Sequence, residues 1–415
     1  MPQLRCIAPG AGPVCALEEL LGAQAAQAFL DTSWPERHFA AHQPAAALPA
    51  VLRDPAFASL EALAHRYQGP VTFGRGAREA RTASSDANAG SLYRMGLSVY
   101  LPDIDAAVAG ATPWLRAIER ALGVPAGCAR LGAFASPAGD GIACHFDADD
   151  VISIQLTGSK VFYVAKVDGL AYPAGQQFGP NMLPGDELYP QAPAGFPEPS
   201  NATFERIDMR PGSVLFLPRG TWHRSEAPED SFSVSIGMRP PAAMERLLQR
   251  LRDLLLQDPA WRRPLYEANA EAPARLALEA RLDAHLRQLP AVLEQVRGAD
   301  LVLPATPALP LRADSRLQAI PMAQLQTTRL TATPRIQLSV SAWDEEWMAR
   351  TTLDTEVPAH LAPALAWLAA HRGAFDVGCF EQRFAALPGG DLRQLLELLV
   401  RAGYLRLLWF PVLRN

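Results

Sequence analysis

The chain has 415 residues, of which 49% are hydrophobic, which predicts two or three folded domains and excludes a disordered protein. Its net charge of -5 and pI near 5.9 exclude a global positive field, so nucleic acid is an unlikely partner. The five cysteines are odd in number and lack CxxC spacing, which favours reduced thiols in a cytoplasmic protein and no zinc site. Because no apolar run approaches the roughly 20 residues that span a bilayer, we expect a soluble protein without a membrane partner.

Residues 1–128 are expected to form a helical N-terminal scaffold. Leu17, Leu20 and Leu21 recur at helical spacing, and a loop is expected from Phe39 to Leu48. This scaffold should precede the segment that carries the chemistry.

Residues 129–240 have a different pattern, in which short apolar or alternating runs are separated by Gly and Pro. Such a series predicts a small β-barrel. The stretch from Asp168 to Asn201 is rich in Pro, Gly and Gln and lacks periodicity, which is typical of a functional or a disordered loop. A lid over the barrel mouth is one interpretation. The expected strands are Arg130–Phe134, Val151–Leu156, Val161–Val164, Val214–Leu217 and Phe232–Ile236.

Residues 241–300 return to a helical pattern with a wide leucine stripe, which either the barrel or a second subunit could cover, so a homodimer is one expectation. Pro304, Pro307 and Pro310 mark residues 301–334 as a linker. Residues 335–415 are expected to form a winged-helix-like domain.

The order expected in this last domain is strand, three helices and a strand ending at Trp409. Asp391 is the expected N-cap of the last helix and Gly403 the residue after its end. Since phosphate contacts supply most of the affinity for DNA, the small excess of arginine favours a protein-contact or dimer role over DNA binding.

His145-Phe146-Asp147 is the first motif that carries chemistry. Side chains on a strand alternate between its two faces, so His145 and Asp147 on one strand would share a face and could bind one ion together. Such a tripeptide also arises by chance, and it needs support from elsewhere in the chain.

That support comes from residues 212–223, Gly-Ser-Val-Leu-Phe-Leu-Pro-Arg-Gly-Thr-Trp-His, which resemble the second metal motif of the cupin superfamily. Pro211-Gly212 predicts one turn, and Pro218 with Gly220 a second turn that presents His223 at the barrel mouth. Two histidines and one aspartate form the facial triad of non-haem Fe(II), which keeps positions open for an oxidant.

Lys160 is the third element, and with Lys166 it is one of only two lysines in a chain whose other basic residues are arginines. A lysine at a strand end is commonly exposed. A compact ammonium projecting into a barrel can instead pair with the distal carboxylate of 2-oxoglutarate. Ser153, Ser233 and Ser235 are candidates to line the same pocket.

The stretch from Ser136 to Lys160, taken with the second motif, resembles the JmjC/cupin-4 hydroxylases, both the ribosomal-protein and the asparaginyl branches, over residues 129–240. The resemblance implies an α+β fold with a double-stranded β-helix core, helical flanks and a C-terminal winged-helix-like domain. It also implies that His145, Asp147 and His223 bind Fe(II) as the catalytic metal centre. Lys160 would bind the 5-carboxylate of 2-oxoglutarate, and O2 would take the remaining site.

The leading hypothesis is therefore a 2-oxoglutarate-dependent dioxygenase that hydroxylates a C–H bond of a protein or peptide side chain, with a ribosomal protein as one candidate. The same chemistry on a small metabolite or a peptide natural product is a second hypothesis, which a closed pocket would favour. A cupin regulator that binds metal without turnover is a third. The presence of Lys160 argues against the regulator, because a site for metal alone needs no buried cation.

Overall fold

A computed structural model describes residues 15–67, 69–75, 83–85, 88–125, 127–178, 187–193, 195–302, 311–321, 323–329, 334–344 and 349–408. Cys6, Trp409 and the expected linker prolines Pro304, Pro307 and Pro310 lie outside these residues. The chain divides into two compact units. One comprises residues 1–239, 319–373 and 399–406, and the other comprises residues 240–318, 374–398 and 407–415. Within the described ranges, no helix is long and apolar enough to cross a membrane.

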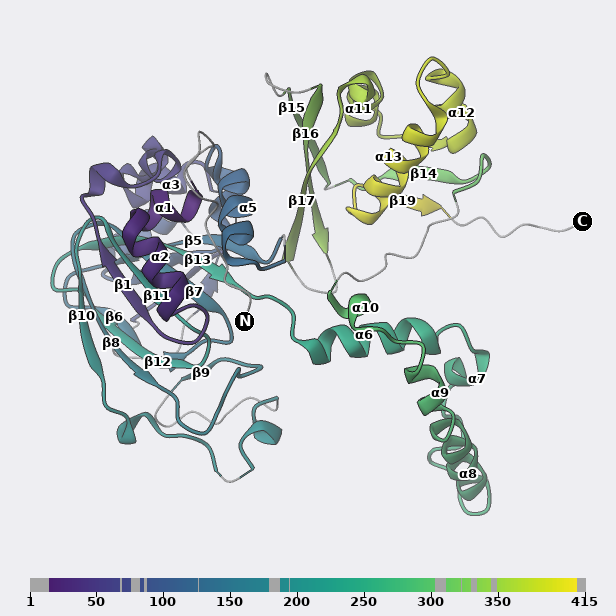
Figure 1. The fold of residues 1–415 in the computed structure, drawn as a ribbon, viewed down its shortest axis with the longest axis horizontal. Helices are drawn as coiled ribbons and strands as arrows, with labels where there is room; N and C mark the ends of the chain where they lie inside the picture. The colour runs from purple at the N-terminus through teal and green to yellow at the C-terminus, as the bar shows by residue number, and fades with distance from the viewer. Residues whose placement is uncertain are drawn as a thin grey trace, which may run out of the picture. The chain divides into compact units, whose positions relative to one another are not determined.

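The core of the first unit is a double-stranded β-helix made of two antiparallel sheets (Figure 1). The major sheet has the order β1-β11-β7-β13-β5-β4-β2-β3, and the minor sheet has the order β10-β8-β12-β6-β9. The expected jelly-roll fold is thereby confirmed. The strands are β1 (Phe39–His42), β2 (Val71–Gly74), β3 (Ala83–Ser85), β4 (Ser98–Leu101), β5 (Ala129–Ser136), β6 (Gly141–Phe146), β7 (Asp150–Thr157), β8 (Lys160–Lys166), β9 (Gln177–Phe178), β10 (Glu205–Met209), β11 (Ser213–Leu217), β12 (Thr221–Glu226) and β13 (Ser231–Met238).

The N-terminal part differs from the expected helical scaffold, because it supplies four strands of the major sheet as well as helices. The expected loop at 39–48 contains β1, which pairs with β11 in the register Phe39↔Phe216. Strands this short show no clear alternation, and only their pairing partners reveal them. The helices here are α1 (Ala16–Leu21), α2 (Ala23–Thr32), α3 (Leu60–Ala64), α4 (Ala89–Arg94) and α5 (Ala111–Leu122).

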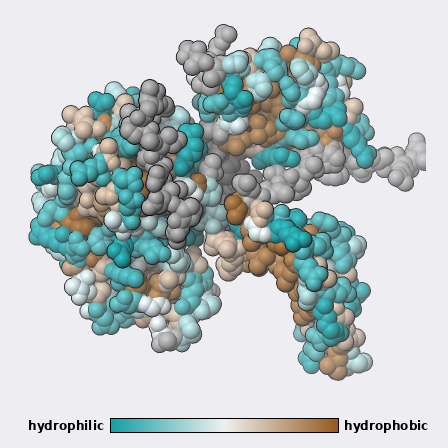
Figure 2. Space-filling view, viewed as in Figure 1, coloured by the Kyte–Doolittle hydropathy of each residue, from teal (hydrophilic) through white to brown (hydrophobic). Residues whose placement is uncertain are grey.

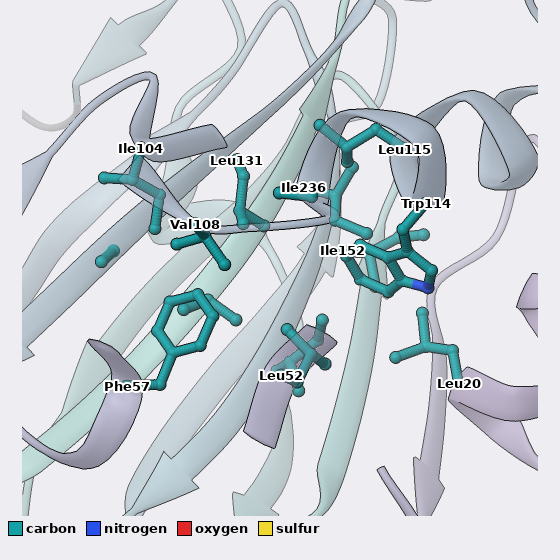
Figure 3. Packing of buried hydrophobic residues seen from close by; sticks show 14 of the residues in the cluster. Leu20, Leu52, Phe57, Ile104, Val108, Trp114, Leu115, Leu131, Ile152 and Ile236 are labelled. Carbon is teal, nitrogen blue, oxygen red and sulfur yellow. The ribbon is translucent and has the colours of Figure 1, made fainter. Parts of the chain in front are cut away.

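One face of the major sheet packs against these helices and forms the main hydrophobic core. Figure 3 shows Leu20 and Leu115 from helices α1 and α5 meeting Leu131, Ile152 and Ile236 from the strands, and all five are buried. Since side chains alternate along a strand, the residues between these apolar positions face the barrel interior. The positions of the apolar core residues therefore determine which strand residues can line the interior of the barrel.

The second unit begins with a helical segment of five helices, α6 (Ala243–Leu255), α7 (Pro259–Arg262), α8 (Ala274–Leu286), α9 (Leu289–Leu293) and α10 (Gly298–Val302). Helix α6 has no buried residue, although its leucines lie on one side. Helices thus occur across residues 241–300, and α6 and α8 have 13 residues each, while the role of this segment as a separate domain stays a prediction.

The expected linker is shorter than residues 301–334, because β14 (Arg316–Ala319) and β15 (Gln324–Arg329) lie within it. A sheet of order β15-β16-β17 and a small sheet of order β18-β14-β19 follow. Gly403 has φ +72°, as a residue after a helix end requires, but Asp391 lies inside the first turn of α13 and is not its N-cap. The other elements are β16 (Arg335–Asp344), β17 (Ala349–Pro358), α11 (Ala362–Ala370), β18 (Ala374–Asp376), α12 (Val377–Arg383), α13 (Gly389–Arg401) and β19 (Leu405–Leu408). A winged helix stays a prediction.

Candidate metal centre

Three predicted ligands meet at the mouth end of the barrel. His145 on β6 and His223 on β12 are direct partners in the minor sheet, and Asp147 follows the last residue of β6. The Nε2 atoms of His145 and His223 lie 3.7 and 3.6 Å from Oδ2 of Asp147. One ligand atom from each of the three residues lies within 4.8 Å of the ligand atoms of the other two. This is the spacing that a single metal ion requires.

Both histidine rings are oriented by their own strands. Nδ1 of His145 lies 2.8 Å from the carbonyl of Ala143, and Nδ1 of His223 lies 2.9 Å from the carbonyl of Thr221. A carbonyl oxygen only accepts, so each Nδ1 carries the proton and each Nε2 presents a lone pair. Burial, with His145 beside it, lowers the pKa of His223 to about 4, which keeps this ring neutral as metal ligation requires.

Asp147 is held by a residue that no motif identifies. Nε2 of Gln176 donates to Oδ1 of Asp147 at 2.7 Å, and the backbone N–H of Gly220 donates to the Asp147 carbonyl at 2.8 Å. Gln176 lies in the aperiodic stretch after β8, and only the pairing of β9 with β6 brings it to the site. The sequence carries no spacing signal that could have identified it.

Lys160 lies inside the barrel. Val164 pairs with His223, so Val164, Phe162 and Lys160, which alternate along β8, face the same interior. The Lys160 side chain is 1% exposed, and Nζ lies 5.6 Å from the ring of Phe134 and 6.0 Å from that of Phe162. The predicted surface alternative is therefore wrong.

The charge of Lys160 is not balanced by a direct partner. Among the residues that the structure describes, the Lys160 ammonium has no hydrogen-bond or ion-pair partner. Burial lowers the pKa of Lys160 to about 8, and the more distant carboxylate of Asp140 only partly opposes this shift. An unpaired buried ammonium is costly, and an anionic ligand in the barrel would offset that cost.

The serines proposed for the pocket face the same interior. Ser153 on β7 and Ser235 on β13 are direct partners, whereas their neighbours Ile152 and Ile236 point into the core on the other face. Ser233, two residues from Ser235, shares this orientation. The structure thus places these serines along the barrel wall, while their contact with a co-substrate stays a prediction.

The described parts of the stretch from Asp168 to Asn201 lie in two places: Gln176 contacts Asp147 at the mouth, and other residues pack on the minor sheet. A lid over the mouth stays a prediction. Leu170 and Leu188 are buried against Phe146 and Trp222, and Phe196 stacks on Phe146 at 6.2 Å between ring centroids. Phe146 and Trp222 point away from the interior because they alternate with His145 and His223. These apolar residues therefore cover the outer face of the minor sheet, where Cys144 also packs.

The family comparison agrees with this geometry. Residues 122–246 match the family model described as the JmjC domain. Together with the triad and Lys160, this match defines the barrel as a JmjC domain of the Fe(II)- and 2-oxoglutarate-dependent oxygenase class.

The chain is also similar to particular proteins. It is 24% identical over 256 residues to "Uncharacterized protein YxbC" of Bacillus subtilis (strain 168), which covers 59% of this chain and 77% of the relative. Similar solved structures include the Escherichia coli ribosomal oxygenase YcfD, with a TM-score of 0.44, 18% identity and coverage of 92% of this chain and 97% of that one. YcfD in complex with cobalt and 2-oxoglutarate gives a TM-score of 0.42, 18% identity, and coverage of 92% and 97%. At TM-scores this low, the likeness carries no inference about substrate.

Proposed function

We propose that this protein is an Fe(II)- and 2-oxoglutarate-dependent hydroxylase that acts on a side chain of a protein or peptide. The observation that carries the chemistry is the presence, in one barrel, of a His-Asp-His triad and a buried ammonium, that of Lys160, which has no ion-pair partner among the described residues. Iron bound to the triad would supply the activation of O2. His145, Asp147 and His223 hold the metal, and Lys160 holds the distal carboxylate of the co-substrate.

A protein substrate is the finer part of the proposal. The chain carries a helical segment and two further sheets outside the barrel, and these offer surface that a small metabolite would not need. The resemblance of residues 129–240 to the ribosomal-protein hydroxylases makes ribosomal proteins the first candidates to test. We propose a cytoplasmic location, which the free thiols of Cys128, Cys144 and Cys379 support.

The chemistry is tested by anaerobic titration of 2-oxoglutarate into the Fe(II)-loaded protein while the visible metal-to-ligand charge-transfer band is recorded. We expect the band in the wild type and no band in His223→Ala. Lys160→Ala should keep iron but bind 2-oxoglutarate far more weakly. A folded, iron-loaded wild type without the band would overturn the oxygenase and favour the metal-binding regulator.

The substrate class is tested by incubating the active enzyme with ribosomal proteins and with a peptide library. We expect a mass increase of one oxygen atom on a side chain. Turnover of small metabolites alone, with no peptide hydroxylated, would favour the second hypothesis.

We also propose that the helical segment, residues 243–302, contacts a second copy of the chain. Met244 and Leu248 on α6 are 58% and 57% exposed, and Figure 2 shows hydrophobic surface along this segment. Exposed apolar surface of this kind marks contact sites. Self-association is measured in one of the predictions below.

A further inference from the structure

We propose that Gln176 is a positioning residue for the metal ligand Asp147. Gln176 belongs to residues 168–204, here called the insert, of which the structure describes 168–178, 187–193 and 195–204. The inference rests on the metal site of the proposed function but does not depend on the substrate or on turnover. It concerns how this chain keeps one carboxylate oxygen directed at the metal.

The two oxygens of Asp147 have different environments. Oδ2 is the atom near Nε2 of both histidines, at 3.7 and 3.6 Å. Oδ1 accepts the hydrogen bond from Gln176 at 2.7 Å. Because one oxygen is occupied by the amide, Asp147 presents a single oxygen to the metal, and the other coordination positions stay open.

A glutamine is suited to this role because its amide donates a hydrogen bond without adding charge. An arginine at position 176 would offset the carboxylate charge and compete with the cation. A glutamate would place a second carboxylate against Asp147 and repel it. Gln176 therefore orients Asp147 and leaves its charge available to the metal.

The sheet itself brings Gln176 to Asp147. In the pairing of β6 with β9, His145 is opposite Phe178 and Phe146 is opposite Gln177. One residue further in the same antiparallel register, Asp147 is opposite Gln176. The hydrogen bond thus follows from strand pairing and does not depend on a free loop.

Apolar residues of the insert pack against the residues that are adjacent in sequence to the metal ligands. Phe146 lies between His145 and Asp147, and Trp222 directly precedes His223. The rings of Phe146 and Trp222 meet edge to face at 4.8 Å, and Leu170 and Leu188 of the insert bury them. One hydrophobic cluster on the outer face of the minor sheet therefore packs against both strands that carry metal ligands.

A second glutamine in the insert provides a matched control. Oε1 of Gln191 accepts from the backbone N–H of Ala174 at 3.2 Å, and its Nε2 donates to the carbonyl of Glu187 at 2.7 Å. Gln191 thus joins two parts of the insert without touching a metal ligand. Its substitution loosens the insert and leaves the hydrogen bond to Asp147 in place.

The experiment measures Co(II) binding to full-length wild type, Gln176→Ala and Gln191→Ala by calorimetry and visible absorption, without 2-oxoglutarate or substrate. We expect Gln176→Ala to weaken Co(II) binding by roughly ten- to a hundredfold. Its Co(II) absorption spectrum should also change, because the freed Oδ1 can then reach the metal. Gln191→Ala should bind Co(II) with nearly wild-type affinity and spectrum, and thermal melting should show that both variants are folded.

Two outcomes would overturn the proposal. Wild-type affinity and spectrum in Gln176→Ala would show that Asp147 needs no positioning. An equal loss in both variants would assign the effect to order in the insert and not to the hydrogen bond. Neither outcome affects the charge-transfer test of the proposed function, which uses the wild type.

Discussion

His145 and His223 lie directly opposite each other on β6 and β12, and each ring is hydrogen-bonded through Nδ1 to a carbonyl two residues earlier in its own strand. The same local arrangement thus occurs twice, once on each strand. Because the backbone of the sheet orients both rings, the ligand geometry exists without the metal. In this respect the site differs from small zinc domains, whose folding depends on the ion.

Removal of the metal should therefore leave the fold intact. We expect dialysis against a chelator to leave the far-UV circular dichroism unchanged. The melting temperature should decrease only by the amount that metal binding had added to the stability of the folded state. Addition of Co(II) should restore the visible spectrum without a refolding step. Unfolding of the barrel on chelation would contradict a preformed site.

Binding of 2-oxoglutarate should weaken at alkaline pH through Lys160. Burial lowers the pKa of this ammonium from its ordinary value of 10.5 to about 8, so the charged form that pairs with a carboxylate is lost as the pH rises above 8. The dissociation constant should then rise by about tenfold per pH unit, as proton linkage requires. Lys160→Arg keeps its charge and should bind with little pH dependence. A flat alkaline profile in the wild type would remove Lys160 from the co-substrate site.

The same lowered pKa has a consequence for the stability of the unliganded protein. Between about pH 8 and 10.5 the unfolded chain binds the Lys160 proton more strongly than the folded chain. The free energy of unfolding contributed by Lys160 should therefore increase with pH across this window. Urea titrations at several pH values should show this increase in the wild type and not in Lys160→Met.

Gly132→Ala should disturb the pocket wall. A Cβ on Gly132 would lie 2.6 Å from the ring of Tyr100, which stacks on Phe134 at 4.2 Å and has little room to move. We expect a loss of roughly 1–3 kcal/mol in the free energy of unfolding, as overpacking typically causes. Gly237→Ala on β13 is the control, since a Cβ there meets no atom within 4 Å. Equal stability of the two variants in urea denaturation would show that Tyr100 moves aside freely.

Leu248→Glu should reduce self-association. Leu248 is 57% exposed on α6, and a carboxylate there would be buried without a partner in an apolar contact between copies. Light scattering during size-exclusion chromatography should show a smaller mean mass for Leu248→Glu than for the wild type. Met95→Glu, at a residue that is 73% exposed outside the helical segment, should behave as the wild type. A monomeric wild type would show that another partner, or none, covers this face.

The metal ligands could be predicted from the sequence because local rules position them. Gly and Pro define the turns around β11, and strand alternation places His145 on the interior face. Gln176, by contrast, contacts Asp147 through the pairing of β9 with β6, which no local pattern encodes. Strands β1 to β4 were missed for the same reason, since each is four residues or shorter and depends on its partners.

The position of the insert shows a different limit of sequence patterns. Its lack of periodicity indicated a long surface segment, but it did not indicate that Leu170 and Leu188 would be buried on the outer face of the minor sheet while Gln176 reaches Asp147 at the mouth. Leu170, Leu188 and Phe196 are spaced irregularly, so they gave no sign that they share one cluster. Burial of such residues is decided by the surface they meet, here the outer face of the minor sheet.

Strands β1 to β4 complete the major sheet, although they lie outside the segment that matches the JmjC family model. We therefore expect that a fragment able to fold by itself must be longer than that segment. Residues 122–246 contain only four of the eight strands of the major sheet, and they would leave the edges of β11 and β5 without the strands that cover them. Exposed strand edges invite pairing between molecules. Expressed alone, residues 122–246 should aggregate, so boundaries for domain dissection should begin before α1.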